Sequence, residues 1–386
     1  MRLQRILLPL SGAVVAIVVL VYAFGSGTVA GSPTGGLNRA RVLEVLEEGT
    51  TDLGAGPQTY QLFQIEVLDG GYAGSRLTVD YGRRQVVSEG DGVRAGQEVL
   101  VSVAPSPTGR VEAYFADFVR ITPILGLALV FVVLILVVSR GKGLRALIGM
   151  LLSLAVIGGF ILPAILSGAD PVLVSVSGCF VLMAATFYLI HGWTIKAHTA
   201  ALATLAALML TAALAGLSVG VARLSGLGSE EALFLTQFAD AGLNVRGLLL
   251  ASILIGALGV LDDLTINQIS AVFELRQANP DLAMRSLYRR AMVIGQDHIA
   301  ATVNTLVMAY VGASLPLLLL FTLFEEPFFS ALNRAVIAEE VVRTLVGEIG
   351  LIAAVPIATA LAAAVQRHRG RFPGWLGPEM LPMERE

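Results

Sequence analysis

Long apolar runs alternate with short polar segments over most of the chain, and this pattern predicts membrane-spanning helices. A helix needs about 20 apolar residues to cross the hydrocarbon core of a bilayer. Runs of this kind lie near residues 6–24, 121–139, 146–167, 172–191, 198–222, 247–266, 296–324 and 348–366. We therefore expect an all-α polytopic membrane domain of about eight helices.

Residues 31–119 follow a different pattern, in which short stretches alternate between apolar and polar positions. In Gln61–Val67 the apolar Phe63, Ile65 and Val67 alternate with Gln64 and Glu66, which is the period of a half-buried strand. Similar stretches lie at 41–46, 76–81, 97–103 and 111–118, and a glycine-rich turn at 69–74 joins two of them. These five short strands predict a small all-β, OB-like barrel. We expect a docking module for a protein partner and no nucleic-acid partner, because the basic groove and aromatic platforms that single strands need are missing.

These patterns divide the chain into four parts. We expect an anchor helix at 1–30, an extracytoplasmic β-domain at 31–119 inserted after it, a multi-pass membrane domain at 120–370 and a cytoplasmic tail at 371–386. The first apolar run, Ile6–Phe24, is longer than the apolar core of a usual signal peptide. An uncleaved helix is therefore favoured over a cleaved signal.

Composition agrees with this division. The chain has 386 residues, of which 55% are hydrophobic and 14% are charged, and its mean hydropathy is +0.78. A soluble protein cannot bury so much apolar surface, so the lipid bilayer is the expected surrounding. Cys179 is the single cysteine, which excludes a disulfide within the chain and favours a small buried apolar side chain. No metal site or cofactor is expected, because His191, His198 and His298 form no compact ligand motif.

The basic residues predict the orientation through the positive-inside rule. With the N-terminus inside, thirteen lysines and arginines fall in cytoplasmic segments and four in short outer loops. The inner set is Arg2, Arg5, Arg140, Lys142, Arg145, Lys196, Arg276, Arg285, Arg289, Arg290, Arg367, Arg369 and Arg371, and the outer set is Arg223, Arg246, Arg334 and Arg343. Both termini are therefore expected in the cytoplasm.

Two outer connections are longer than turns require. Residues 228–246 and 325–347 each begin close to a Glu-Glu pair and continue with an amphipathic helical pattern. They suggest a parallel repeat of helix, interfacial segment and helix over 198–266 and 296–366, of a general kind found in transporters. Two unrelated interfacial helices explain the same pattern.

Polar residues inside two of the apolar runs are the candidate site. In the run 247–266 and just beyond it, Ser252, Gly256, Gly259, Asp263 and Asn267 recur three or four residues apart and share one helix face. Small residues permit another helix to approach closely, and polar ones need it as a partner. Carboxylates at membrane depth cost several kcal/mol unless they face protein or water, so they indicate function.

The run 296–324 supplies the expected partner. Asp297, Ala301, Asn304 and Met308 share one face, and Tyr310 lies further along the same run. Asp263 and Asp297 lie toward the cytoplasmic ends of their helices, so we expect them at similar depth in one site. His298 and Asp262 each lie about 100° round the helix from the neighbouring aspartate and are expected at the margin of the site.

Simpler interpretations remain open. Asp262 and Asp263 are also consistent with a solvated helix end paired with Arg289 or Arg290, although carboxylates inside a membrane usually indicate function. Asn304 is consistent with an ordinary hydrogen bond between helices, which contributes about 0.6 kcal/mol on average. Asn279-Pro280-Asp281 predicts a helix stop followed by a new start, with a short cytoplasmic helix that carries Leu282, Leu287, Ala291 and Ile294 inward.

The same stretch resembles the YibE/F-like bacterial membrane proteins. The resemblance rests on IGALGVLDDLTINQ at 255–268, on Asn279-Pro280 and on IGQDHIAATVNTLVMAYVGASLP at 294–316, and the loop from Gly192 to Lys196 is also similar. It covers roughly residues 120–370. The chain departs from the family pattern at Asp262, where an apolar residue is usual, and at Gln296, where a basic residue is frequent. The resemblance implies a multi-pass protein of the bacterial plasma membrane.

Three functions fit these features. The first is a permease whose Asp263 and Asp297 bind a proton or cation while Asn267 and Asn304 orient the substrate. The second is an intramembrane aspartyl hydrolase, although Gly259-Val260-Leu261-Asp262 stands where that class has Gly-x-Gly-Asp. The third is a non-catalytic assembly or sensing protein that acts through its β-domain. A homo-oligomer is compatible with each of the three.

Overall fold

The computed structural model describes residues 37–52, 56–83, 92–106, 110–238, 243–323, 327–368 and 372–379. The predicted first helix and residues 371 and 380–386 of the predicted tail lie outside these residues. The chain divides into two compact units, Met1–Arg140 and Gly141–Glu386, and each is described by itself.

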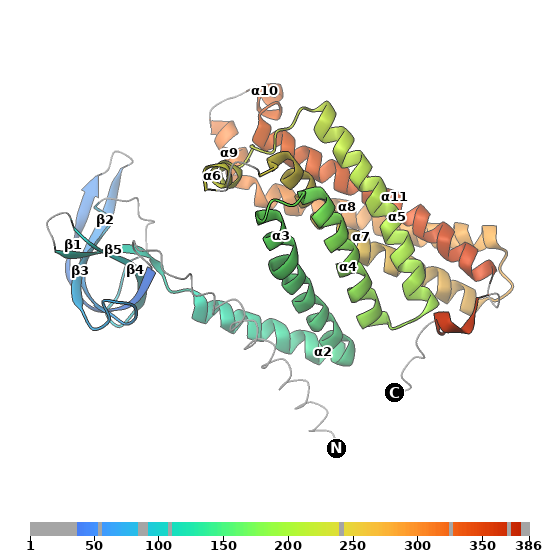
Figure 1. Cartoon of the computed structure of the whole chain (residues 1–386), viewed down its shortest axis with the longest axis horizontal. Helices are drawn as coiled ribbons and strands as arrows, with labels where there is room; N and C mark the ends of the chain where they lie inside the picture. Colours follow the sequence, from blue (N-terminus) through green and yellow to red (C-terminus); the bar gives the residue numbers. More distant parts are fainter. Residues whose placement is uncertain are drawn as a thin grey trace, which may run out of the picture. The chain divides into compact units, whose positions relative to one another are not determined.

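The first unit contains a five-stranded sheet in which all neighbouring strands are antiparallel (Figure 1). The strand order is β3-β2-β1-β4-β5, so the connection from β3 to β4 passes from one side of β1 to the other. The strands are β1 (Leu37–Asp52), β2 (Pro57–Val67), β3 (Arg76–Tyr81), β4 (Glu98–Pro105) and β5 (Val111–Phe118).

The alternating pattern of the sequence forms the core of this domain. Phe63, Ile65 and Val67 of β2 are buried, and the residues between them are half-buried. The outer strands of the sheet meet through aromatic rings, with 4.3 Å between the ring centroids of Tyr81 and Phe115. A small β-domain is therefore present, as predicted. β1 is longer than predicted. Its first part pairs with both β2 and β4, and its second half, beyond register shifts between Val42 and Glu47, pairs with β2 alone.

The second unit is helical, and it begins within α2. The helical elements are α2 (Ile121–Val156), a π-helical turn η1 (Ile157–Ile161), α3 (Leu162–Leu166), α4 (Pro171–His191), α5 (Ile195–Val221), α6 (Glu230–Phe238), α7 (Val245–Ala278), α8 (Met284–Ala313), α9 (Leu315–Leu323), α10 (Phe328–Leu332), α11 (Ala335–Arg367) and a 3₁₀ turn η2 (Gly374–Leu376). Side-chain caps fix several starts: Asp170 accepts hydrogen bonds from the Val172 and Leu173 N–H groups, and Asn244 accepts one from Gly247.

Among the described residues, five helices are long and apolar enough to cross a membrane, and a sixth is added if the bent pair α8 and α9 forms one span. One of the five covers 46 residues, Ile121–Leu166. Arg140 interrupts its helical backbone with φ 48° and ψ −128°, between the two spans predicted there. The membrane domain is thus polytopic as predicted, and the number of eight spans stays a prediction.

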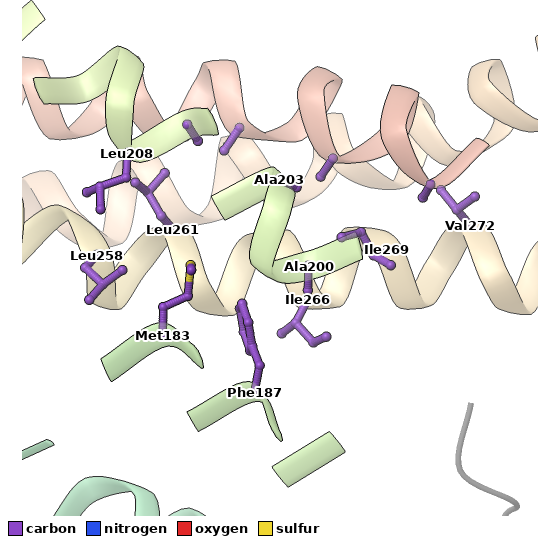
Figure 2. Close-up of a cluster of buried hydrophobic side chains, with 14 of the residues drawn as sticks. Met183, Phe187, Ala200, Ala203, Leu208, Leu258, Leu261, Ile266, Ile269 and Val272 are labelled. Carbon is purple, nitrogen blue, oxygen red and sulfur yellow. The ribbon is translucent and has the colours of Figure 1, made fainter. Parts of the chain in front are cut away.

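Alanine-rich faces bring the central helices together. α5, α7 and α11 pack against one another, and α4 packs against α5 and α7. Figure 2 shows Met183 and Phe187 of α4 pointing toward the α7 residues around Leu261 and Ile266. Small side chains such as Ala203 of α5 let the helices approach closely.

Two segments differ from their predicted form. The second amphipathic segment, predicted at 325–347, is not a separate interfacial helix, because α11 begins at Ala335 and continues without a stop into the predicted span. The first one does contain a short helix, α6. The predicted cytoplasmic helix after Pro280 is likewise the first part of α8, in which Leu287 and Ala291 are buried and Ile294 is exposed.

Candidate functional site

The polar stripe of α7 lies on one helix face, as its spacing predicted. Ser252, Gly256, Gly259, Asp263 and Asn267 are all exposed, and the bundle is contacted by the other face of the helix. An ideal Cβ at either glycine would meet no atom within 4 Å. The stripe is therefore open in the part of the chain that the structure describes.

α8 presents its polar residues outward as well. Asp297, His298, Ala301, Asn304 and Met308 are exposed. The face that docks on the bundle is apolar, and its Met292, Ile299, Val303 and Leu306 pack with Val260 and Leu264 of α7 and with Leu351 and Val355 of α11. Within the described residues, Asp263 and Asp297 share no hydrogen bond and no cationic side chain that pairs with both. That the two form one site therefore stays a prediction.

Asp262 points into the bundle, which was not expected. Its Oδ1 atom is buried and has no hydrogen-bond partner among the described residues. The carboxylate lies within electrostatic reach of Cys179 of α4, which is fully buried as predicted. The two adjacent aspartates thus differ, since Asp262 faces protein and Asp263 is exposed.

Tyr310 is separated from the other α8 candidates. It is half-buried and lies within electrostatic reach of Glu340, Arg343 and Glu348 of α11. Arg343 Nη1 donates a hydrogen bond to Glu340. A second group of titratable side chains therefore lies between α8 and α11.

Glu348 is a residue that sequence reasoning missed. Its side chain is only 6% exposed, and neither carboxylate oxygen has a hydrogen-bond partner among the described residues. Glu339 of the same helix is 5% exposed but accepts hydrogen bonds from the N–H groups of Gly226 and Gly228. The predicted span began at Glu348, so this residue was interpreted as the polar end of a membrane helix. Continuing the helical pattern back to Ala335 would have placed it inside a helix.

Gln268 is a second missed residue, and it links three helices. Its Nε2 donates hydrogen bonds to the Ala291 carbonyl of α8, at 2.9 Å, and to Thr359 Oγ1 of α11, at 2.7 Å. Gly295 lies against it, because an ideal Cβ there would be 2.4 Å from Val355 Cγ1 and 3.0 Å from Gln268 Nε2. α8 packs so closely here that a residue with a side chain would not fit at position 295. Asp297, two residues later, is exposed.

No group of three His, Cys, Asp or Glu residues is placed to hold a metal ion within the described ranges. His198 uses both ring nitrogens elsewhere, with Tyr188 Oη at 2.9 Å and the Leu376 carbonyl at 3.2 Å. The chemistry that the described acids can support is the binding of a proton or a cation, because Asp262 and Glu348 have buried oxygens without a donor.

The fold and these side chains define a multi-pass α-helical membrane protein with a small β-domain and acidic groups on its membrane-length helices. The chain belongs to the YibE/F-like protein family, whose model matches residues 127–368. This range contains α7, α8 and α11 and excludes the β-domain. No curated protein and no solved structure matches the chain.

Proposed function

We propose that this protein is a permease that binds a proton or small cation at acidic side chains of α7, α8 and α11. One observation carries the proposal: Asp262, Asp263, Asp297 and Glu348 lie on membrane-length helices and have no cationic partner among the described residues. Unpaired charge at such a position is costly, so a proton or a bound cation is needed to neutralise it.

The exposed stripes of α7 and α8 support the same proposal. Asp263, Asn267, Asp297 and Asn304 point away from the bundle on helices of membrane length. Lipid offers no hydrogen bonds to such groups, so a water-filled passage or another protein element must face them. In this proposal the four residues line a water-filled passage, and Asp263 and Asp297 bind one proton or cation between them. In the same proposal, Tyr310 lines the passage beside Glu348 of α11.

Three further assignments belong to the proposal. The β-domain is OB-like, which its strand order and the contact between β3 and β5 support. The protein resides in the bacterial plasma membrane with both termini in the cytoplasm, which the thirteen-to-four basic asymmetry supports. The β-domain then lies outside the cytoplasm, where it is free to bind a protein partner.

The test is cation-dependent stability of the purified full-length protein. A ligand that binds only the folded state raises its stability by RT ln(1 + [L]/Kd), so unfolding temperatures are compared over pH and over a series of monovalent and divalent cations. The protein is then reconstituted in liposomes and uptake of the stabilising ion is measured.

We expect one ion to stabilise the wild type and the Asp281→Asn control, whose altered residue is exposed in the α7–α8 loop. The same ion is expected to give no stabilisation of Asp263→Asn. A wild type that responds to no cation and to no change of pH would contradict the proposal.

A further inference from the structure

A basic groove lies where α7, α8 and α11 end or begin. Its volume is about 640 Å³, within the usual range for sites that bind small molecules. Three arginines line it: Arg276 in the last turn of α7, Arg285 in the first turn of α8 and Arg367 at the end of α11. Much of the remaining lining is apolar, as at Leu287 and Ala363. The groove thus combines an apolar wall with a concentration of positive charge.

No acidic side chain of the described residues neutralises this charge by an ion pair. In the described ranges none of the three arginines forms an ion pair. Arg276 donates from Nη1 to the Leu282 carbonyl, but its Nε is buried without an acceptor. Within the described part of the chain, the hydrogen bond of the Arg367 guanidinium is to the Met284 sulfur, at 4.0 Å, which is a weak acceptor. Most of the guanidinium donors therefore have no described acceptor.

The start of α8 adds further positive potential. The residues of its first turn, Met284 and Arg285, and its N-cap residue, Ala283, line the groove. Ala283 offers no side-chain acceptor, and the first turn has no acidic residue. The free N–H groups of a helix start carry about half a positive charge and form a ready anion site. Arg285 adds a full charge there, an unfavourable arrangement unless an anion is bound.

A purely structural explanation covers two of the three arginines. Arg276 and Arg367 lie at helix C-termini, where a cation is favourable, and Arg276 also holds the loop through Leu282. Arg285 lies at the opposite kind of helix end and has no described partner. The nearest acid in the sequence, Asp281, is exposed and does not line the groove.

We propose that this groove binds the phosphate headgroup of an anionic phospholipid. The three arginines lie at the ends of long helices, and Arg367 directly follows the predicted span 348–366, so we place the groove near the level of the lipid headgroups. Basic pockets between helices at this level bind anionic headgroups, and arginine suits phosphate because its planar donors bind two oxygens at once. The apolar wall and the half-buried ring of Tyr288 lie where the glycerol and upper acyl chain of such a lipid would pack.

The experiment uses the full-length protein in bilayer discs. The discs contain phosphatidylcholine alone or mixed with phosphatidylglycerol in equal parts, and a third arm adds inorganic phosphate to the phosphatidylcholine discs. Unfolding temperature is recorded, and binding of phosphatidylglycerol is titrated in mixed micelles. The variant is Arg285→Gln with Arg367→Gln, and the control is Arg289→Gln, which changes an exposed α8 arginine one turn away that does not line the groove.

Wild type and control are expected to unfold at a higher temperature with phosphatidylglycerol, and the variant is expected to lose this shift and bind about tenfold more weakly for each arginine replaced. Should the variant not fold, Arg285→Lys with Arg367→Lys keeps the charge and is expected to bind more weakly than wild type. Equal stability in both lipids overturns the proposal. So does a full shift with inorganic phosphate alone, an equal loss in the Arg289→Gln control, or unchanged binding by the lysine variant.

Discussion

At the scale of single residues, two buried glutamates of α11 separate a structural role from a functional one. Glu339 accepts two backbone hydrogen bonds, whereas both oxygens of Glu348 have no described partner. Burying an unpaired acid costs free energy, so Glu348 lowers stability unless it binds a proton or cation.

We therefore predict opposite effects for the same substitution at these two positions. Glu339→Gln is expected to destabilise the protein by about 1 kcal/mol, because a charge-assisted bond becomes a neutral one. Glu348→Gln is expected to leave the unfolding temperature unchanged or to raise it, while reducing the stabilisation by cations. Thermal unfolding in one detergent, with and without the stabilising ion, measures both. An equal loss of stability in the two variants would show that Glu348 has a structural partner.

Asp117 of the β-domain gives a prediction for acid pH. Its pKa is lowered by the hydrogen bond from Arg120 and then by that from the Phe118 N–H group. Because the folded pKa lies below the unfolded one, this contribution to stability is present above the unfolded value of about 3.9 and is lost as the pH falls through the folded pKa. The difference in unfolding temperature between wild type and Asp117→Asn should therefore be small at neutral pH and vanish in stronger acid. If the unfolding temperatures of wild type and Asp117→Asn still differ in strong acid, the Asp117 carboxylate is not the cause of the difference.

The residues of the site were only partly predictable. Spacing alone placed Ser252, Gly256, Gly259, Asp263 and Asn267 on one face, because helical geometry fixes relative angles. It could not tell which face meets the bundle, since that depends on which neighbour α7 packs against. Hence the inward direction of Asp262 and the buried position of Gln268 emerged only from the packing.

At the scale of elements, strand positions were predicted better than helix ends. The alternation in Gln61–Val67 needs only local sequence, and β2 ends at Val67 as predicted. The start of α11 was placed 13 residues late, at 348 instead of Ala335. Its first part is amphipathic and polar, so hydropathy alone could not join it to the apolar part that follows.

The docking of α8 gives a prediction for two glycines. Gly295→Val is expected to destabilise the bundle by about 1 to 3 kcal/mol, because even a Cβ there would be 2.4 Å from Val355 Cγ1. Gly259→Val serves as the control, since a Cβ there meets nothing within 4 Å in the described chain. Unfolding in detergent checks the pair, and equal destabilisation would mean that the stripe of α7 is covered.

The β-domain is predicted to fold without the helices. Its core of Phe63, Ile65, Val79, Val99 and Val101 comes from its own strands. A fragment of residues 33–118 should be soluble, give a dispersed amide spectrum and unfold cooperatively. An unstructured fragment would show that the strands need the membrane domain, and would weaken their proposed role in docking.

At the scale of the whole molecule, several of the described basic residues that define the predicted orientation lie close together in the helical unit, as Arg276, Arg285 and Arg367 do around one groove. Lys196 lies within electrostatic reach of Lys142 and of Glu274 near the end of α7, and the segment at 372–379 bonds to Ile195 through the Pro378 carbonyl. The sequence predicted which segments share a side, since each helix reverses direction. The assignment of one side to the cytoplasm rests on the positive-inside rule, because packing within the protein is the same in either orientation.

Cysteine labelling in intact cells tests the orientation. Cysteines introduced at Gly71 and Pro327 are expected to react with an impermeant thiol reagent, and one at Ala278 is expected to react only after the cells are opened. The native Cys179 is fully buried and provides a low background. Labelling at Ala278 in intact cells would reverse the predicted topology.

The central claim is that acidic groups of α7 and α8 bind one proton or cation together, and a double-mutant cycle on Asp263 and Asp297 tests it most directly. Asparagine keeps the shape of each side chain and removes its charge. We predict that Asp263→Asn and Asp297→Asn each abolish the stabilisation by the bound ion while folding is kept, and that the double variant is no worse than either single one. Partial losses that add in the double variant would contradict the account, because they would place the two carboxylates in independent sites.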